Sequence, residues 1–203
     1  METDRKWIVV RIDGKIAAVS TDYRKLAEIS AQLAGVYGEI TAVAEDFEEV
    51  WKLRQTVKWE DLMLFGTDFQ KKVWKKLWKL THRENTEKLT DTENPKNSQN
   101  SSRPGLISYS DFAQLCENRA GVRAVAHAVG LNPVSVIIPC RLVVPKESID
   151  KMTTIQKKAD TTIFKGDDLC LNSILSDASI DFGEYSLGRE LKRRFITIEL
   201  TGQ

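Results

Sequence analysis

Residues 132–140 read N-P-V-S-V-I-I-P-C and place a cysteine directly after a proline, at the end of an apolar run. The run is rich in β-branched residues, which predicts a buried β-strand over 134–138. Pro139 has no backbone N–H to donate, so we expect the strand to end there. Cys140 would then lie at the edge of the core on rigid backbone, which suits a positioned nucleophile. The stretch alone favours a structural cysteine instead, because free cysteine commonly packs as a small buried hydrophobe.

The composition limits the classes of protein to which the chain can belong. With 203 residues, of which 41% are hydrophobic, the chain can bury a core in one or two small domains. Its 30 basic and 29 acidic residues give a net charge of +1, so any contact with nucleic acid must come from a local arrangement of charge. The N-terminus has no apolar signal core, and no apolar run approaches the length of a membrane span.

The cysteines and histidines argue against a disulfide scaffold and a metal centre. Three cysteines at unpatterned spacings do not predict disulfides, and Cys116 and Cys170 are expected to be buried or incidental. Two histidines and the lack of a paired cysteine motif argue against structural zinc. We therefore expect no metal and no cofactor, and a reducing intracellular compartment as the setting.

The first 62 residues combine strand and helix signals and predict a small α/β domain. The expected elements are strands at 7–11 and 15–20, the Asp13-Gly14 hairpin turn between them, and a short amphipathic helix from Leu26 to Leu33. Residues 39–60 carry mixed signals that favour neither a strand nor a helix.

A second domain is predicted over residues 63–203, and its first element is a helix that begins after Thr67. Thr67 and Gln70 have the spacing of a capping box, and apolar residues follow at helical intervals. Two stretches interrupt this domain and are predicted to contain loops. The first, at about 82–105, is polar, whereas the second, at about 145–180, contains apolar clusters that could order part of it.

Two short helices joined by a turn are predicted in the middle of this second domain. The first begins after Ser108, a suitable N-cap, and ends near Asn118. The second runs over 122–129, with its valines on one face, and Gly130 can end it. A helix pair with a glycine-containing turn predicts a helix-turn-helix, although most helix pairs bind no nucleic acid.

The second helix of this pair has a composition that suits close approach to a DNA groove. Ala124, Ala126 and Ala128 keep it slim, and Arg123 projects near its start. Small and cationic residues of this kind are typical of minor-groove binding with base extrusion. From the residues alone, Arg123 is interpreted as a solvated surface arginine.

The segment N-P-V-S-V-I-I-P-C-R-L-V-V at 132–144 resembles the active-site segment of the O6-alkylguanine-DNA alkyltransferases, which reads N-P-x-P-x-x-I-P-C-H-R-V-V. It departs from that pattern where Ser135 replaces a proline, Arg141 a histidine and Leu142 an arginine. Further segments resemble the family in the same order along the chain: G-T-D-F-Q-K-K-V-W at 66–74, S-Y at 108–109, V-R-A-V-A-H-A-V-G-L-N-P at 122–133, and the spacing from Tyr185 to Glu199. The resemblance implies an alkyltransferase-like fold, with an α/β N-terminal domain and a mainly helical C-terminal domain that contains the helix-turn-helix. It also implies that the stretches at about 82–105 and 145–180 are insertion loops.

The resemblance also implies a role for each residue in the family register. Cys140 would accept the alkyl group, Tyr109 would contact the flipped lesion, and Glu199 would form the acidic end of a proton relay. Arg123 would fill the space left by the flipped nucleotide. The residues implied to bind DNA are Arg123, Ala124, Ala126, His127, Asn132, Tyr185 and Ser186. Plainer interpretations remain open, because Tyr109 could be a packing residue and Glu199 a solvated carboxylate at a helix end.

Arg141 stands where the family has the histidine that serves as a base. A guanidinium is always protonated and cannot accept a proton. It could favour the thiolate by its charge and could pair with Glu199, which would give Cys140 a static charge arrangement. The loss of a general base typically costs about a hundred- to ten-thousand-fold in rate. His127 and His82 occupy none of the family's catalytic positions.

Three functions follow from these patterns. The favoured one is a suicide DNA-repair protein that moves an alkyl group from O6-alkylguanine in double-stranded DNA to its own Cys140, once per molecule. The second is a lesion-binding protein with little or no transfer, like the alkyltransferase-like branch, although that branch keeps the histidine and replaces the cysteine. The third is a degenerate scaffold without a DNA role. We expect a monomer in the cytoplasm, nucleoid or nucleus, without membrane association.

Overall fold

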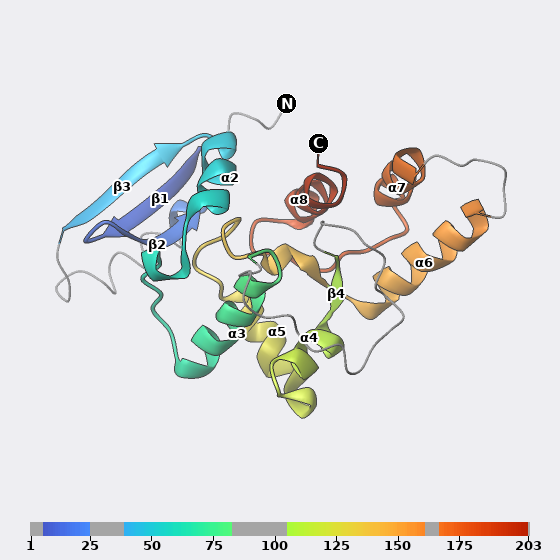
Figure 1. Ribbon diagram of the computed structural model, residues 1–203, viewed down its shortest axis with the longest axis horizontal. Helices are drawn as coiled ribbons and strands as arrows, with labels where there is room; N and C mark the ends of the chain where they lie inside the picture. The colour runs from blue at the N-terminus through green and yellow to red at the C-terminus, as the bar shows by residue number, and fades with distance from the viewer. Residues whose placement is uncertain (1–5, 25–38, 83–104, 161–166, 203) are drawn as a thin grey trace.

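The computed structural model describes residues 6–24, 39–82, 105–160 and 167–202, with an antiparallel sheet in the N-terminal part and mainly helices in the rest (Figure 1). This is the predicted fold class. The predicted helix at 26–33, nearly all of the predicted loop at 82–105 and the side chain of Cys170 lie outside the described residues. The domain boundary at residue 62 stays a prediction.

The N-terminal sheet has three strands in the order β2-β1-β3. β1 (Trp7–Ile12) pairs antiparallel with β2 (Lys15–Ser20) and with β3 (Ile40–Glu45). Asp13 (φ 48°) and Gly14 (φ 78°) form the turn between β1 and β2, which confirms the predicted hairpin. The stretch with mixed signals resolves into β3, the helix α2 (Phe47–Thr56) and the short 3₁₀ helix η1 (Trp59–Asp61).

α3 (Asp68–Lys79) begins with the predicted capping box. The Thr67 hydroxyl accepts from the backbone N–H of Gln70 at 3.2 Å, and the Gln70 side chain accepts from the backbone N–H of Thr67 at 2.8 Å. Its buried face includes Trp74, whose indole N–H donates to the Ala128 carbonyl at 2.8 Å. This bond ties α3 to the second helix of the helix-turn-helix.

The predicted helix-turn-helix consists of α4 (Tyr109–Leu115), the 3₁₀ turn η2 (Arg119–Gly121) and α5 (Val122–Gly130). Ser108 caps α4 as predicted, because its hydroxyl accepts from the backbone N–H of Asp111 at 3.0 Å. α4 ends earlier than predicted, since the chain turns through a positive φ of 58° at Glu117. Before α4, β4 (Ile107–Ser108) pairs parallel with β5 (Val143–Val144).

The strand predicted over 134–138 is wrong. These residues form a buried loop of turns that makes only a single bridge, between Val134 and Val19 of β2. Val136 has a φ of 72°, a left-handed conformation that a β-branched residue rarely adopts and that no regular strand contains. The apolar composition of the run therefore reflects its burial in a loop and does not indicate a strand. The loop leads into the 3₁₀ helix η3 (Cys140–Leu142).

The stretch predicted at about 145–180 is ordered in part, as its apolar clusters indicated, and most of its described residues are helical. α6 (Lys146–Asp160) and α7 (Asp167–Ser176) lie beside the C-terminal helix α8 (Arg189–Thr201), at the right of Figure 1. Apolar side chains from this region and from α8 form a separate core cluster that includes Val144, Ile174, Leu175, Ile180, Phe182 and Ile196. Burial of these side chains stabilises α6 and α7. The polar residues between the apolar clusters make these helices difficult to predict from the sequence.

The main core joins the N-terminal sheet to α8. The rings of Phe47 and Phe195 stack with their centroids 5.1 Å apart, and Trp7 packs against both. This contact holds the C-terminal end of the chain against α2 and brings residues from both ends of the sequence to one place. Within the described ranges, no helix combines the length and apolar character needed to cross a membrane.

Candidate active site

Cys140 is the first residue of η3 and is 5% exposed. The Asn132 side-chain amide donates to the Ile138 carbonyl at 2.9 Å and to the Cys140 sulfur at 3.2 Å. Its oxygen accepts from the backbone N–H of Val134 at 3.1 Å. One buried amide therefore closes the loop and holds the thiol. The thiol is more enclosed than the predicted position at the edge of the core, because the loop folds over it instead of ending as an open strand.

The groups next to the thiol are polar as well as apolar. Tyr109, the first residue of α4, has its pKa raised by burial and then by the charge of Cys140. Tyr185 is half-buried, but its hydroxyl is buried and has no hydrogen-bond partner of regular geometry in the described part of the chain. Burial, and after it the charge of Cys140, raises the pKa of Tyr185. Both predicted tyrosines thus lie close enough to Cys140 to respond to its charge.

Lys192 is a buried cation beside this site that was not among the residues predicted for it. Its ammonium group on α8 donates to the carbonyls of Val143 at 3.0 Å and Glu184 at 3.4 Å. It lies 5.8 Å from the ring centroid of Tyr109. Burial lowers its pKa to about 8, although the charge of Cys140 opposes that change. Its position between Tyr185 and Glu199, in the last segment that resembles the family, was the available signal.

Arg141 is fully buried and pairs with Glu199, the arrangement considered from the sequence. Its Nε lies 3.2 Å from Glu199 Oε2, its Nη2 binds the same oxygen, and its Nη1 donates to the Val136 carbonyl at 3.0 Å. Glu199 is therefore no solvated carboxylate at a helix end. Arg141 also supports the left-handed turn at Val136, so the residue that replaces the family histidine helps to hold the loop that carries the thiol.

Arg54 completes this cluster and was missed from the sequence. Its Nη2, which reaches in from α2, binds the other oxygen of Glu199. The Trp51 ring lies against both guanidinium groups, with its centroid 4.5 Å from Cζ of Arg54 and 5.1 Å from Cζ of Arg141. Burial lowers the pKa of Arg54, as does the charge of Arg141. No motif marks an arginine 145 residues away from its carboxylate.

Neither histidine hydrogen-bonds to Cys140. His82 stacks on Trp78, its Nε2 lies 2.9 Å from the Arg54 carbonyl, and its Nδ1 lies 3.2 Å from the Trp78 carbonyl. Burial lowers the pKa of His82. His127 is exposed on α5. The half-buried imidazole of His82 therefore contacts the backbone of Arg54 and not the thiol.

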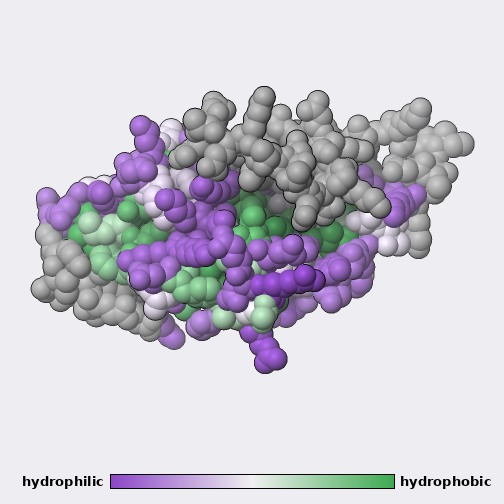
Figure 2. Space-filling view, turned by 60° about the horizontal axis from the view of Figure 1, so that its bottom comes forward, coloured by the Kyte–Doolittle hydropathy of each residue, from purple (hydrophilic) through white to green (hydrophobic). Residues whose placement is uncertain are grey.

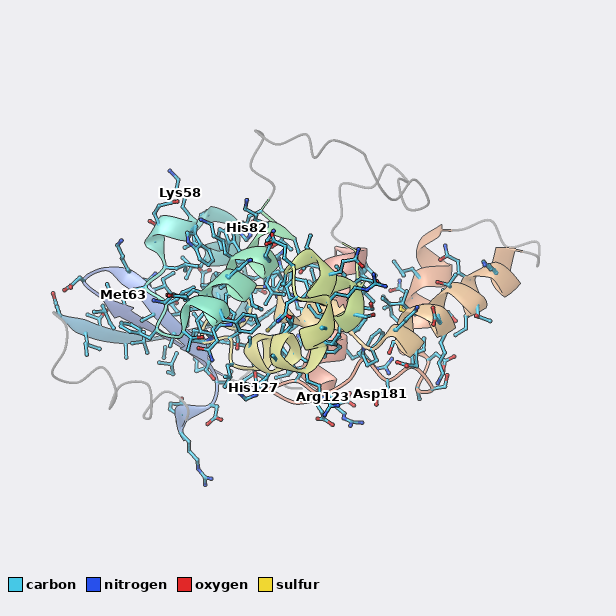
Figure 3. The ribbon with its side chains drawn as sticks, turned by 90° about the horizontal axis from the view of Figure 1, so that it is seen from below. Lys58, Met63, His82, Arg123, His127 and Asp181 are labelled. Atoms are coloured by element: carbon cyan, nitrogen blue, oxygen red, sulfur yellow. The ribbon has the colours of Figure 1, made fainter. Side chains whose placement is uncertain are left out.

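The predicted DNA-contacting residues of α5 are on its outer side. Arg123, Ala124 and His127 are exposed, while Ala126 is half-buried. Seen from below, Arg123 and His127 lie along the same edge of the molecule, away from His82 (Figure 3). Figure 2, in which the bottom of the molecule comes forward, shows a broad hydrophilic band with apolar residues between. α5 runs almost directly into Asn132, so a short connection joins this face to the residue that holds the thiol. Ser186 is exposed next to Tyr185.

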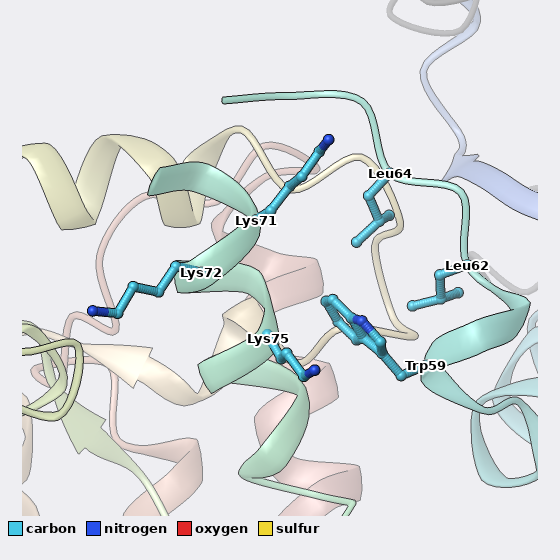
Figure 4. A pocket seen from close by; sticks show the side chains of 6 residues that line it. All are labelled: Trp59, Leu62, Leu64, Lys71, Lys72 and Lys75. Atoms are coloured by element: carbon cyan, nitrogen blue, oxygen red, sulfur yellow. The ribbon is translucent and has the colours of Figure 1, made fainter. Parts of the chain in front are cut away.

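A separate hollow of about 490 Å³ lies between η1 and α3, and none of the predicted site residues lines it (Figure 4). Its lining consists of Trp59, Leu62, Leu64, Lys71, Lys72 and Lys75. Lys75 lies over the Trp59 ring at 5.6 Å, and Lys72 pairs with Glu117 at 2.9 Å. Two of its three cations are thus already engaged.

Comparisons with known proteins concern the part of the chain that holds this site. Residues 103–161, which include the helix-turn-helix and Cys140, match the family described as 6-O-methylguanine DNA methyltransferase, DNA binding domain. The chain is 29% identical over 133 residues to a probable methylated-DNA–protein-cysteine methyltransferase of Acanthamoeba polyphaga mimivirus, covering 66% of this chain and 68% of the relative.

Two further similarities have more limited weight. The methylated-DNA–protein-cysteine methyltransferase of Haemophilus influenzae is 32% identical over 82 residues, which cover 40% of this chain and 34% of that protein. Among solved structures, an O6-methylguanine-DNA methyltransferase of Pyrococcus kodakaraensis aligns with a TM-score of 0.49 at 22% identity, covering 97% of this chain and 93% of that one.

Proposed function

Residues 103–161 of the chain match the 6-O-methylguanine DNA methyltransferase family, and from this similarity we propose that the protein repairs O6-alkylguanine in double-stranded DNA. In this proposal Cys140 accepts the alkyl group and each molecule acts once. The observation that carries it is the setting of Cys140, whose sulfur is held by Asn132 among Tyr109, Tyr185 and Lys192. A merely structural cysteine needs no such polar surroundings.

The proposed reaction is a displacement at the alkyl carbon. The Cys140 thiolate attacks that carbon, a carbon–sulfur bond forms, and the bond from carbon to the guanine oxygen breaks with its electron pair. The leaving guanine gains a proton, and the Tyr109 hydroxyl is a suitable donor. Arg141 cannot take the thiol proton, because a guanidinium stays protonated. We propose that it favours the thiolate through its charge instead.

The proposed DNA contact is the outer side of α5 in the minor groove. Arg123 would occupy the space left by the extruded nucleotide, while Ala124 and Ala126 let the helix approach closely and His127 faces the DNA backbone. Tyr185 and Ser186 would close over the flipped base. The Tyr185 hydroxyl has no regular hydrogen bond to hold it. We propose that this side chain moves aside to admit the base, and that a single copy of the protein suffices.

A second candidate function is recognition of the lesion without transfer. It is favoured by one observation, that no imidazole contacts Cys140 while Arg141 is held by Glu199 and Val136. Such a protein would bind alkylated DNA through α5 and leave the lesion in place. Both functions require DNA inside the cell, in the cytoplasm, nucleoid or nucleus.

One experiment separates these functions. The protein is incubated with duplex DNA that contains O6-methylguanine or O6-benzylguanine, and its intact mass is measured, with Cys140→Ser as the control. A methyl or benzyl gain that is absent from the variant supports the transfer function. Selective binding of the alkylated duplex without a mass gain supports the recognition function. Equal binding of alkylated and unmodified DNA without a mass gain contradicts both.

A further inference from the structure

Arg54 links the N-terminal part of the chain to the candidate active site. It lies on α2, and its side chain is 11% exposed. It binds Oε1 of Glu199, whereas Arg141 binds Oε2, so each carboxylate oxygen is occupied by a different arginine. Trp51, one turn earlier on α2, covers both guanidinium groups. The backbone carbonyl of Arg54 is in turn bonded to His82.

The cluster carries an excess of positive charge. Two guanidinium groups and one carboxylate sum to +1, and both arginines stay protonated under ordinary conditions. Without Arg54, the charges of Arg141 and Glu199 would cancel. Arg141 follows Cys140 directly in the chain, and the charges of both residues act on the Tyr185 hydroxyl, so the excess charge lies within electrostatic range of the thiol. In a poorly hydrated site a nearby cation favours the ionised form of an acid.

We propose that Arg54 is a positioning residue for Cys140, which acts by holding the second oxygen of Glu199 and leaving the charge of Arg141 uncompensated beside the thiol. The proposal rests on Cys140 as the reacting group of the proposed function. In this proposal a fixed cluster of charges favours the Cys140 thiolate, whereas a general base would form the thiolate by accepting the thiol proton. The N-terminal part then contributes directly to the reactivity of a thiol in the C-terminal part.

Other charged and titratable groups also face the thiol and must be held constant in a test. They are Tyr109 on α4, Arg141 on η3, Tyr185 in the loop before α8, and Lys192 on α8 with Asp181 and Glu184 behind it. Arg141 shares Glu199 with Arg54, whereas the two tyrosines and Lys192 bond to neither residue in the described part of the chain. A substitution at Arg54 therefore changes the cluster and leaves these neighbours in place.

The test measures alkylation of Cys140 by iodoacetamide between pH 6 and 10, with peptide mapping to separate it from the other cysteines. In Arg54→Gln the rate at pH 7 should fall about three- to tenfold, since a unit charge near an acid typically moves its ionisation by about a unit. The loss should shrink toward pH 10, where the thiol ionises in both proteins. Arg54→Lys, which keeps the charge, should recover most of the rate. Lys52→Gln, with the same charge change at an exposed site on α2, should leave the profile unchanged.

Thermal unfolding of each variant separates a purely structural role from this one. A lower melting temperature for Arg54→Gln with an unchanged pH profile would overturn the proposal, as would an equal rate loss in Lys52→Gln. If Arg54→Gln does not fold, Arg54→Lys still decides, because a loss of about three- to tenfold at pH 7 in a variant that keeps the charge contradicts a charge effect. The assay contains no DNA, so failure of alkyl transfer from DNA and failure of the Arg54 proposal are distinguishable.

Discussion

The side-chain amide of Asn132 donates to the sulfur of Cys140 at 3.2 Å while it also donates to the carbonyl of Ile138. The same side chain therefore shapes the loop and orients the thiol. A buried donor at this distance fixes the position of the sulfur relative to the loop. Loop geometry and reactivity are coupled through one residue.

Asn132→Ala should lower both stability and the reactivity of Cys140. The backbone groups of Val134 and Ile138 would lose their buried partners, which costs about 2–4 kcal/mol in total. Urea unfolding measures the first effect, and the rate of alkyl transfer measures the second. Gln114→Ala, at an exposed site on α4, is the control and should change neither. If the Asn132→Ala protein is as stable as the natural chain and transfers at a normal rate, the loop does not depend on the hydrogen bonds of Asn132.

Local signals in the sequence were sufficient for much of the fold. The Asp13-Gly14 turn, the Thr67 capping box and the Ser108 cap each depend on neighbouring residues, and each prediction is confirmed. The apolar run before Cys140 was assigned to a strand because β-branched composition indicates burial and strand alike. The loop differs from a strand because the side chains of Asn132 and Arg141 donate hydrogen bonds to its backbone carbonyls. The spacing of apolar residues in the sequence does not predict such bonds.

In the candidate site, too, some residues could be predicted from sequence patterns and others could not. Cys140 and Glu199 were identified because the segments that contain them match the family in the same order. That match also predicted that the two residues lie in one site. Arg54 reaches the site only because the N-terminal helix packs against α8, a tertiary contact without a sequence pattern. A long-range ion pair of this kind becomes visible only when the fold is known.

Arg141→His should raise the rate of alkyl transfer. Histidine would place a proton acceptor beside Cys140, and general bases typically contribute about a hundredfold or more to rates. Stability should fall by about 1–3 kcal/mol, because the Val136 carbonyl loses its buried donor. Single-turnover transfer from O6-benzylguanine DNA measures the rate, and Arg141→Gln, which removes the charge without adding a base, is the control. A rate for Arg141→His at or below that of the natural chain would contradict a latent relay through Glu199.

His82 should make the protein less stable as the pH falls. Burial lowers the pKa of His82 in the folded state below its ordinary value of 6.5. The unfolded chain therefore binds a proton first, and stability is lost as the pH drops from about 6.5 through the folded value. Unfolding in urea at pH 7.5 and 5.5 should show a smaller loss for His82→Gln than for the natural chain. Equal losses would mean that other groups dominate this range.

Lys192 should make stability rise at alkaline pH. The pKa of Lys192 is about 8 in the folded state, below its ordinary value of 10.5. Between these two pH values the unfolded chain keeps the proton that the folded chain has lost, so stability rises with pH. The natural chain should gain up to about 3 kcal/mol relative to Lys192→Met between pH 8 and 10.5, at about 1.4 kcal/mol per unit. Urea unfolding at several pH values measures the difference. A difference that stays constant with pH would show that the ammonium group is not desolvated.

Arg123→Ala should weaken binding to alkylated DNA without affecting the fold. Arg123 is exposed on α5 and bonds to no residue in the described ranges, so its removal should change stability by less than about 0.5 kcal/mol. An arginine inserted beside an extruded base stabilises the flipped state, and the preference for alkylated over unmodified duplex should therefore fall. Fluorescence anisotropy with both duplexes at several salt concentrations measures this preference, and Arg194→Ala, at an exposed site on α8, controls for general charge. Equal weakening of both duplexes would assign Arg123 to phosphate contact, and an unchanged affinity would place the DNA on another face.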